Sequence, residues 1–231
     1  MQRIRPFMNT DLIKVFTGIR RAGKSVMLEL VKNELKESGI SEENFLCINF
    51  EQFSNSQFLD VESLYKKITD FQKNTKGKIY LFFDEIQEVD GWEKCINSCR
   101  IDFDCDIYIT GSNAKLLSGE LTTYLAGRYV EFVIYPFSFA EFFEMNLIKN
   151  PNVDKATCFM QFLKTGGMPF LSNFPDDDSA KSQYLIDIYN SVVLKDVVTK
   201  IINKLIRKFL YKKLISLNSL LINNYPRKLC N

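Results

Sequence analysis

The chain has 231 residues, of which 46% are hydrophobic and 25% charged, and its formal net charge is +2. This length suits one α/β domain with a small appendage, and the apolar content is sufficient for a sizeable core. A nearly neutral chain gives no general indication of nucleic-acid binding. The absence of histidine excludes Cys/His zinc sites, Cys–His nucleophile pairs and Ser-His-Asp triads.

No apolar run reaches the length of a transmembrane helix, and the first residues, MQRIRPFMNTD, lack the apolar core of a secretory signal. A cytoplasmic protein without a membrane span is therefore expected. Three of the six cysteines, Cys95, Cys99 and Cys105, lie close in sequence, and no C-x-x-C pair occurs. We interpret them as reduced thiols that pack as small apolar groups, the alternative being a metal or redox cluster.

Five runs are predicted to form strands, and the run at 79–85 is too continuously apolar for a surface position. They cover residues 12–17, 44–50, 79–85, 105–110 and 128–135. Helical spacing of apolar residues is seen at 26–35, 61–71 and 92–99. Strands that alternate with helices indicate an α/β domain around a parallel sheet with right-handed crossovers. In such a sheet the ligands bind at the carboxyl ends of the strands.

Beyond the fifth strand, the pattern between residues 138 and 200 predicts helices only, at 139–147, 158–165 and 184–198. This region is expected to form a small helical lid subdomain, with breaks at Pro151, Pro169 and Pro175. The predicted organisation is thus a core at 1–137, a lid at 138–200 and a tail at 201–231.

The motif GIRRAGKS follows the first predicted strand and fits the phosphate-binding pattern G-x-x-x-x-G-K-[ST]. Its glycines allow the backbone to approach phosphate oxygens, and the N–H groups of the next helix point toward the anion. Lys24 is expected to reach the β- and γ-phosphates, and the Ser25 hydroxyl to hold Mg²⁺. Arg20 and Arg21 could also reach phosphate, although surface ion pairs are favoured. The candidate nucleotide-binding residues here are Gly18, Ile19, Arg20, Arg21, Ala22, Gly23, Lys24, Ser25 and Val26.

Two adjacent acids, Asp84 and Glu85, close the predicted strand at 79–85. Burying a carboxylate at the end of an apolar strand costs free energy, so its presence there indicates a functional role. Asp84 suits a role on Mg²⁺ through the metal's water shell, and Glu85 suits a general base that orients the attacking water. Because adjacent side chains on a strand point to opposite sides, the strand tip must bend for both to serve. The plainer alternative is that Asp84 caps the next helix and Glu85 is solvated.

Polar residues at the end of the fourth strand and an arginine that opens the fifth are further candidates. Thr110, Ser112 or Asn113 could sense the γ-phosphate or hold the water, although Gly-Ser-Asn equally suits a turn. Arg128 could stabilise charge during phosphoryl transfer, in cis or from a neighbouring subunit, or it could be solvated.

Five segments cover most of residues 13–169: IKVFTGIRRAGKS, IYLFFDEIQEVDGWE, IYITGSNAKLL, LAGRYVEFVIYPFSFAEF and GGMP. Together they resemble the AAA-type P-loop ATPases found as uncharacterised ATP-binding proteins across bacteria and archaea. The resemblance implies an additional-strand catalytic-Glu core with a five-stranded parallel sheet in the order 5-1-4-3-2. It also implies Mg-ATP as ligand, with Asp84 as the metal acid and Glu85 as the base. Related signalling ATPases carry a Gly-x-Pro near the adenine, which Gly167-Met168-Pro169 could match if it is not a plain turn.

The last segment, residues 201–231, departs from the rest of the chain. It contains seven Lys or Arg and no Asp or Glu. Members of the family usually continue into a C-terminal domain of unknown role, so a truncated or out-of-frame end is one interpretation. The other is a basic amphipathic helix that contacts nucleic acid, anionic lipid or a protein partner.

Three functions remain open from the sequence. The first is hydrolysis of Mg-ATP to ADP and phosphate as a conformational switch or motor, in a homo-oligomer if Arg128 acts in trans. The second is a non-hydrolysing, nucleotide-dependent interaction or regulatory module. The third is a small-molecule kinase or a GTPase, but the guanine signature N-K-x-D is absent and an Asp-Glu pair fits attack by water better.

Overall fold

Five parallel strands form a single sheet in the order β2-β3-β4-β1-β5, which confirms the predicted order. The computed structural model describes residues 1–111, 125–174 and 177–192, and the tail at 201–231 lies outside them. The chain divides into two units, Met1–Gln183 and Tyr184–Asn231. The strands are β1 (Ile13–Thr17), β2 (Phe45–Asn49), β3 (Ile79–Asp84), β4 (Cys105–Thr110) and β5 (Tyr129–Val133).

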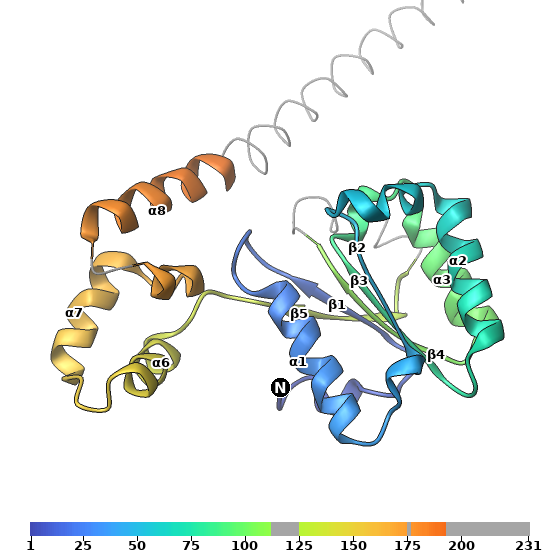
Figure 1. Cartoon of the computed structure of the whole chain (residues 1–231), viewed down its shortest axis with the longest axis horizontal. Coiled ribbons are helices and arrows are strands. Elements are labelled where there is room, and N and C mark those ends of the chain that lie inside the picture. The colour runs from blue at the N-terminus through green and yellow to red at the C-terminus, as the bar shows by residue number, and fades with distance from the viewer. Residues whose placement is uncertain (112–124, 175–176, 193–231) are drawn as a thin grey trace, which may run out of the picture. The chain divides into compact units, whose positions relative to one another are not determined.

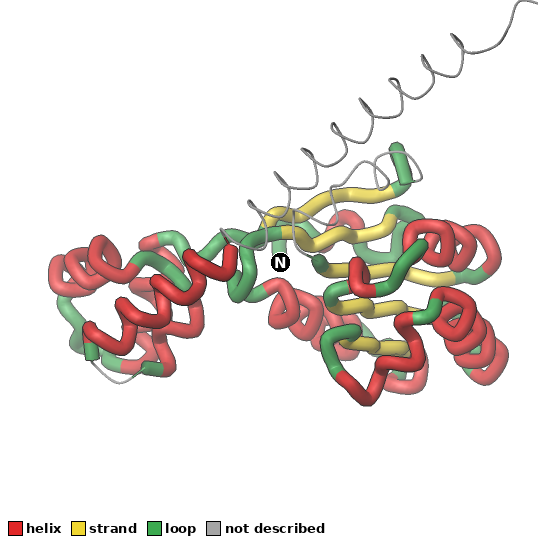
Figure 2. Tube along the Cα trace, turned by 90° about the horizontal axis from the view of Figure 1, so that it is seen from above, coloured by secondary structure: helices red, strands yellow, loops and turns green. Residues whose placement is uncertain are grey.

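Helices cover both faces of the sheet, with α1 on one face and α2 and α3 on the other (Figures 1 and 2). The long helices of this region are α1 (Lys24–Glu37), α2 (Val61–Asn74) and α3 (Trp92–Asp102). Short 3-10 turns are η1 (Arg5–Phe7), η2 (Glu42–Asn44), η3 (Phe53–Leu59), η4 (Ile86–Glu88) and η5 (Pro169–Asn173). In the described part of the chain, no helix is long and apolar enough to cross a membrane.

The two faces of the sheet pack into two separate apolar cores, which explains why the strands are continuously apolar in sequence. Every residue of β1, β3 and β4 is buried. The core under α2 and α3 includes Ile13, Val15, Ile48, Leu64, Ile68, Leu81, Phe83, Ile96 and Ile107. The core under α1 includes Phe16, Leu28, Val31, Leu35, Phe45, Tyr80, Phe82, Tyr108 and Phe132.

The three neighbouring cysteines lie in the first of these cores as free thiols, in keeping with the apolar interpretation. Burial raises the pKa of the Cys105 thiol to about 12, so this side chain stays protonated at neutral pH. Among the described residues, no group of three or more Cys, Asp or Glu side chains could hold a metal ion.

A buried ion pair joins β1 to β4 at the end of the sheet where these strands begin. Lys14 and Asp106 are fully buried, and the ammonium donates to the carboxylate and to the carbonyl of Thr10 at 2.9 Å. Asp106 also accepts from the Asn9 N–H and the Tyr108 hydroxyl, both at 2.7 Å. Burial lowers the pKa of Lys14, and the Asp106 carboxylate partly offsets this shift.

Replacing Lys14 with methionine is expected to lower the free energy of unfolding by about 3–5 kcal/mol, because Asp106 is left buried without its cation. Urea denaturation would measure this loss. The matched control is Lys78→Met, since Lys78 pairs at 3.5 Å with a largely exposed Asp104 and such pairs contribute about 0–1 kcal/mol. Similar losses in the two variants would contradict the importance of the buried pair.

Beyond β5, the chain forms the helices α6 (Phe139–Lys149), α7 (Lys155–Thr165) and α8 (Asp178–Val192). Ser138 and Glu141 form a capping box at the start of α6, and the Asp154 carboxylate caps α7. Aromatic side chains join α6 to α7: the Phe139 ring lies 5.0 Å from Phe159 and 5.6 Å from Phe162, between ring centroids. Three helices are therefore present where the sequence predicts them, with α7 and α8 beginning earlier than expected. Residues 193–198 of the last predicted helix lie outside the described residues.

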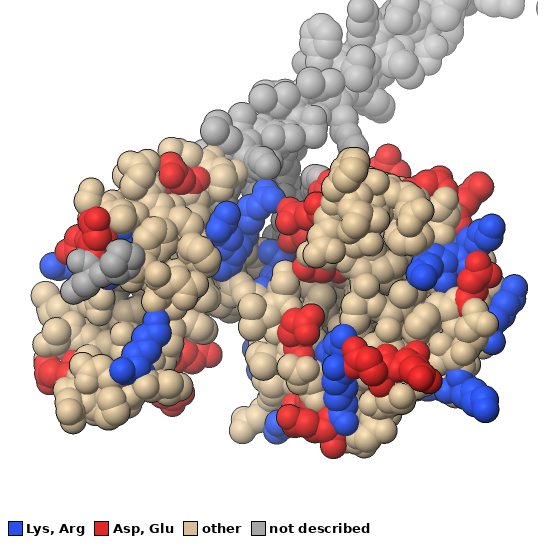
Figure 3. Space-filling model, in the orientation of Figure 1, with Lys and Arg blue, Asp and Glu red and all other residues tan. Residues whose placement is uncertain are grey.

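Positive and negative side chains are interspersed over the face of the molecule shown in Figure 3. Ion pairs between surface residues include Arg5 with Glu34 at 2.6 Å and Lys32 with Glu42 at 3.0 Å. Mixing of both signs on this face agrees with the near-neutral charge of the chain.

Candidate functional site

Four strands end at the same edge of the sheet and bring polar residues together there. The parallel strands β1, β2, β3 and β4 end at Thr17, Asn49, Asp84 and Thr110. Asn49 lies opposite Asp84 in the register of β2 and β3, and Phe16 lies opposite Thr110 in β1 and β4. The phosphate-binding motif begins directly after Thr17, so the loop shares this edge with the polar strand ends.

The backbone of the loop takes conformations that favour glycine at both motif glycines. Gly18 has φ +145° and Gly23 has φ +106°. A Cβ on Gly18 would lie 2.2 Å from the carbonyl oxygen of Ile134, whereas one on Gly23 would meet nothing within 4 Å. Gly18 is therefore required for close packing of the backbone, and Gly23 for its left-handed conformation.

Helix α1 begins at Lys24, and its N-cap residue, Gly23, has no side chain to cap it. The first N–H groups of the helix thus keep their capacity to bind an anion. The Lys24 side chain is only 5% exposed, and its ammonium lies 3.4 Å from the carbonyl oxygens of Gly18 and Ile19. The same ammonium lies 3.7 Å from Oε1 of Glu85. Lys24 and Glu85 therefore meet beside the loop.

Asp84 is a buried carboxylate with donors on both oxygens. It is 7% exposed, and Oδ1 accepts a hydrogen bond from the Thr110 hydroxyl. The side-chain amide of Asn49 donates to Oδ2 at 3.0 Å. These neighbours hold the carboxylate in one orientation and compensate part of the cost of its burial.

Glu85 follows the last residue of β3 and adopts a left-handed backbone conformation, with φ +55° and ψ +47°. A non-glycine residue in this conformation carries strain of about 1–3 kcal/mol. The Thr110 hydroxyl accepts a hydrogen bond from the Glu85 N–H at 2.9 Å, which stabilises the bend. On a regular strand the side chains of Asp84 and Glu85 would point to opposite faces of the sheet. The bend removes this difficulty, because it turns the Glu85 carboxylate toward Lys24 while Asp84 stays in the sheet.

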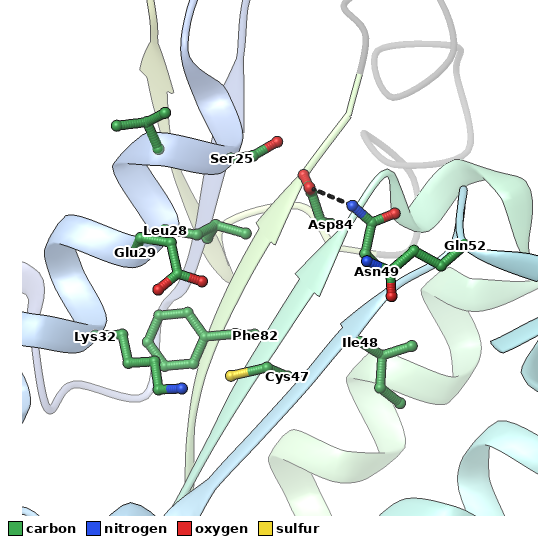
Figure 4. Close-up of a pocket in the computed structure, with 11 residues that line it drawn as sticks. Ser25, Leu28, Glu29, Lys32, Cys47, Ile48, Asn49, Gln52, Phe82 and Asp84 are labelled. Atoms are coloured by element: carbon green, nitrogen blue, oxygen red, sulfur yellow. Dashed lines mark hydrogen bonds between the residues drawn. The ribbon is translucent and has the colours of Figure 1, made fainter. Parts of the chain in front are cut away.

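A cavity of about 370 Å³ lies between helix α1 and the neighbouring strands β2 and β3. Ser25 and Asp84 line it together, and Figure 4 shows both side chains at its end nearest the loop. Farther along the cavity lie Glu29 and Lys32 from α1 and Cys47 from β2. The cavity therefore places a hydroxyl and a carboxylate, both hard oxygen ligands, beside open space.

Arg128 lies apart from these residues within the chain. It directly precedes β5, whose first residue pairs with Ile13 at the start of β1, whereas the loop follows the end of β1. Five residues at the rise of a strand correspond to roughly 16 Å. The Arg128 guanidinium donates to the side-chain oxygen of Asn97 at 3.1 Å. Arg128 therefore lies near the end of the sheet that is opposite to the loop of its own chain.

The remaining predicted residues have separate surroundings. Arg20 forms a surface ion pair with Glu51 at 2.7 Å, and the Arg21 guanidinium lies 5.8 Å from the centre of the Phe170 ring. Pro169 begins η5. Ser112 and Asn113 lie outside the described residues.

Two polar neighbours of the acid pair were missed from the sequence. Asn49 ends β2 and contacts Asp84, and Gln87 donates to Oε2 of Glu85 at 2.6 Å. A polar residue at the end of an apolar strand is a weak signal for Asn49. No local pattern indicates Gln87, because its contact depends on the bend at Glu85.

A glycine-rich loop between the first strand and the first helix of a parallel sheet, with an acid pair at the tip of another strand, defines the P-loop NTPase class. Both features and the order of the strands are present here. A family model described as an AAA domain matches residues 10–143. The chain belongs to this AAA domain family.

Two relatives are uncharacterised proteins of prokaryotes, as the resemblance predicted. One from Haemophilus influenzae is 43% identical over 199 residues, which are 85% of the chain and 49% of that protein. One from Methanocaldococcus jannaschii is 35% identical over 201 residues, which are 81% of the chain and 42% of that protein. The chain spans about half the length of the curated relatives it matches.

Among solved structures, that of AMPPCP-bound DnaA from Aquifex aeolicus matches with a TM-score of 0.52 at 16% identity. The match covers 99% of the chain and 68% of that DnaA chain. At this identity the likeness concerns the fold, and it agrees with the predicted P-loop architecture.

Proposed function

We propose that the chain binds Mg-ATP at the loop of residues 18–25 and hydrolyses it to ADP and phosphate as a conformational switch or motor. The observation that carries this proposal is the meeting of Lys24 and Glu85 beside the loop, 3.7 Å apart, next to the Ser25 and Asp84 pair. A cation for the phosphates, a base for the water and two oxygen ligands for a metal are the parts that hydrolysis of a nucleotide needs.

The residues present fit a magnesium ion. The Ser25 hydroxyl and the Asp84 carboxylate line one cavity, and oxygen ligands are those that Mg²⁺ prefers. No larger acidic cluster exists in the described ranges, which suits an ion that takes its other ligands from phosphates and water. When bound, the ion would neutralise charge on the phosphate oxygens. Asp84 is proposed to hold it through its water shell.

In the proposed reaction, each side chain has one task. Lys24 binds the β- and γ-phosphates and neutralises their charge. Glu85 accepts a proton from water while the water oxygen bonds to the γ-phosphorus and the bond to the β-phosphate oxygen breaks. Thr110 supports both acids, since its hydroxyl contacts the Asp84 carboxylate and the Glu85 N–H. Ser112 and Asn113 are proposed to sense the γ-phosphate.

Pro169 is proposed to lie near the adenine. The linker after β5, residues 134–137, supports this idea, because one end contacts the residue directly before the loop and the other contacts the Gly167-Met168-Pro169 turn. The Ile134 N–H donates to the carbonyl of Thr17 at 2.7 Å, and the Phe137 N–H donates to the carbonyl of Gly167 at 2.8 Å. A nucleotide whose phosphates lie in the loop could therefore extend its base along this linker.

The experiment that tests the function is a phosphate-release assay on the full chain with Mg-ATP. Turnover that exceeds the background of Lys24→Ala is expected. Binding of ATP without such turnover would contradict the ATPase proposal and favour the non-hydrolysing interaction module.

Arg128 is proposed to act on the nucleotide of a neighbouring subunit, since it lies away from the loop of its own chain. The expected result is that ATP and Mg²⁺ shift the chain to oligomers in sedimentation velocity experiments. Arg128→Ala should slow hydrolysis by about 10³-fold or more while ATP binding is kept. Full activity of a monomer would exclude this role.

A further inference from the structure

Gln87 lies in the turn after β3, two residues beyond Glu85. Its side-chain nitrogen donates to Oε2 of Glu85 at 2.6 Å and has a longer contact, 3.5 Å, with Oε1 of Glu88. Its side-chain oxygen, Oε1, is buried and makes no hydrogen bond within the described part of the chain. The amide nitrogen is thus bound to Glu85, whereas the amide oxygen can still accept a hydrogen bond.

The contact matters because the two oxygens of Glu85 face different partners. Oε1 faces the Lys24 ammonium at 3.7 Å, and Oε2 accepts from Gln87. In the proposed reaction the Lys24 ammonium also binds the phosphates, so its electrostatic interaction with Glu85 weakens when ATP binds. Thr110 fixes the backbone of Glu85 but makes no hydrogen bond to the carboxylate. Gln87 is then the donor that keeps the carboxylate oriented.

We propose that Gln87 is a positioning residue for hydrolysis. Its amide nitrogen fixes the Glu85 carboxylate, and its buried oxygen accepts a hydrogen bond from a water molecule in the site. Buried polar atoms rarely lack a partner, and an ordered water satisfies such an atom almost as well as a protein group. This inference rests on the proposed function, because it assigns a role in the same reaction.

The test uses Gln87→Met, which keeps the length of the side chain without its donor or acceptor, and Gln87→Glu, which replaces the donor by a second carboxylate. Both variants are expected to lower kcat about 10–100-fold, while KM and the Kd for Mg-ATP change less than about threefold. Retained ATP binding shows that the variants are folded. The control is Gln57→Met, since Gln57 is an exposed glutamine of η3 and belongs neither to the loop nor to the acid pair.

A double variant separates positioning from structural damage. If Gln87 acts through Glu85, the variant Glu85→Gln/Gln87→Met hydrolyses ATP no more slowly than Glu85→Gln alone. An additional loss of tenfold or more would overturn the proposal, as would full activity of Gln87→Met. Absence of turnover by the wild-type chain would overturn the proposed function and this inference together, whereas the other two outcomes overturn the inference alone.

Discussion

Replacing Lys24 with alanine is expected to abolish useful ATP binding. The Lys24 side chain is 5% exposed and its ammonium lies beside the loop backbone, where it would form a desolvated charge pair with phosphate. Removing one partner of such a pair costs about 2–5 kcal/mol, which raises Kd roughly 30-fold to several thousandfold. Titration of the full chain with Mg-ATP by calorimetry measures the change.

The matched control for this variant is Lys36→Ala. Lys36 lies in the last turn of the same helix and pairs at the surface with Glu42. Its replacement removes the same charge without touching the loop, so the Kd should stay within about twofold. Equal affinity of the Lys24→Ala and Lys36→Ala variants would show that nucleotide does not bind at this loop.

Replacing Glu85 with glutamine is expected to separate binding from hydrolysis. Glutamine keeps the shape of the side chain but cannot accept the proton of the attacking water. General base catalysis contributes about 10²–10⁴-fold to such a step, so kcat should fall by this factor while the Kd for Mg-ATP stays nearly unchanged. Single-turnover hydrolysis of labelled ATP has the sensitivity that is needed for the slow variant.

Glu43→Gln provides the corresponding control. Glu43 is an exposed acid in η2 and is absent from the loop and from the acid pair. It should hydrolyse ATP at the wild-type rate. Hydrolysis at the wild-type rate by Glu85→Gln would exclude Glu85 as the base. Asp84, the last residue of β3, would then be the other acid to test.

The strands and the loop could be predicted because the physics that forms them is local in sequence. Strands buried on both faces are mostly apolar, as in 79–83, and the motif after β1 has a fixed spacing. The ends of elements were less accurate. Strand β5 begins at Tyr129 and ends at Val133, whereas Arg128 to Tyr135 was expected, because the limits of a strand depend on its partner.

The details of the acid pair could not be predicted, because they depend on contacts between distant residues. Nothing in the sequence around Glu85 favours a left-handed backbone, which the Thr110 hydroxyl stabilises from 25 residues away. Asn49 reaches Asp84 only through the register of two strands separated by 35 residues. Arg128 was expected to open β5, whereas it directly precedes that strand. The start of a parallel strand lies at the end of the sheet opposite to the loop, and this consequence was not drawn from the sequence.

The close approach at Gly18 couples the phosphate-binding loop to the segment just after β5. Because an added Cβ would lie 2.2 Å from the carbonyl oxygen of Ile134, any larger residue at position 18 would have to displace that segment. The two glycines of the motif are therefore unequal for protein design. At position 23 only the backbone conformation disfavours other residues, while at position 18 the backbone conformation and the nearby carbonyl both exclude them.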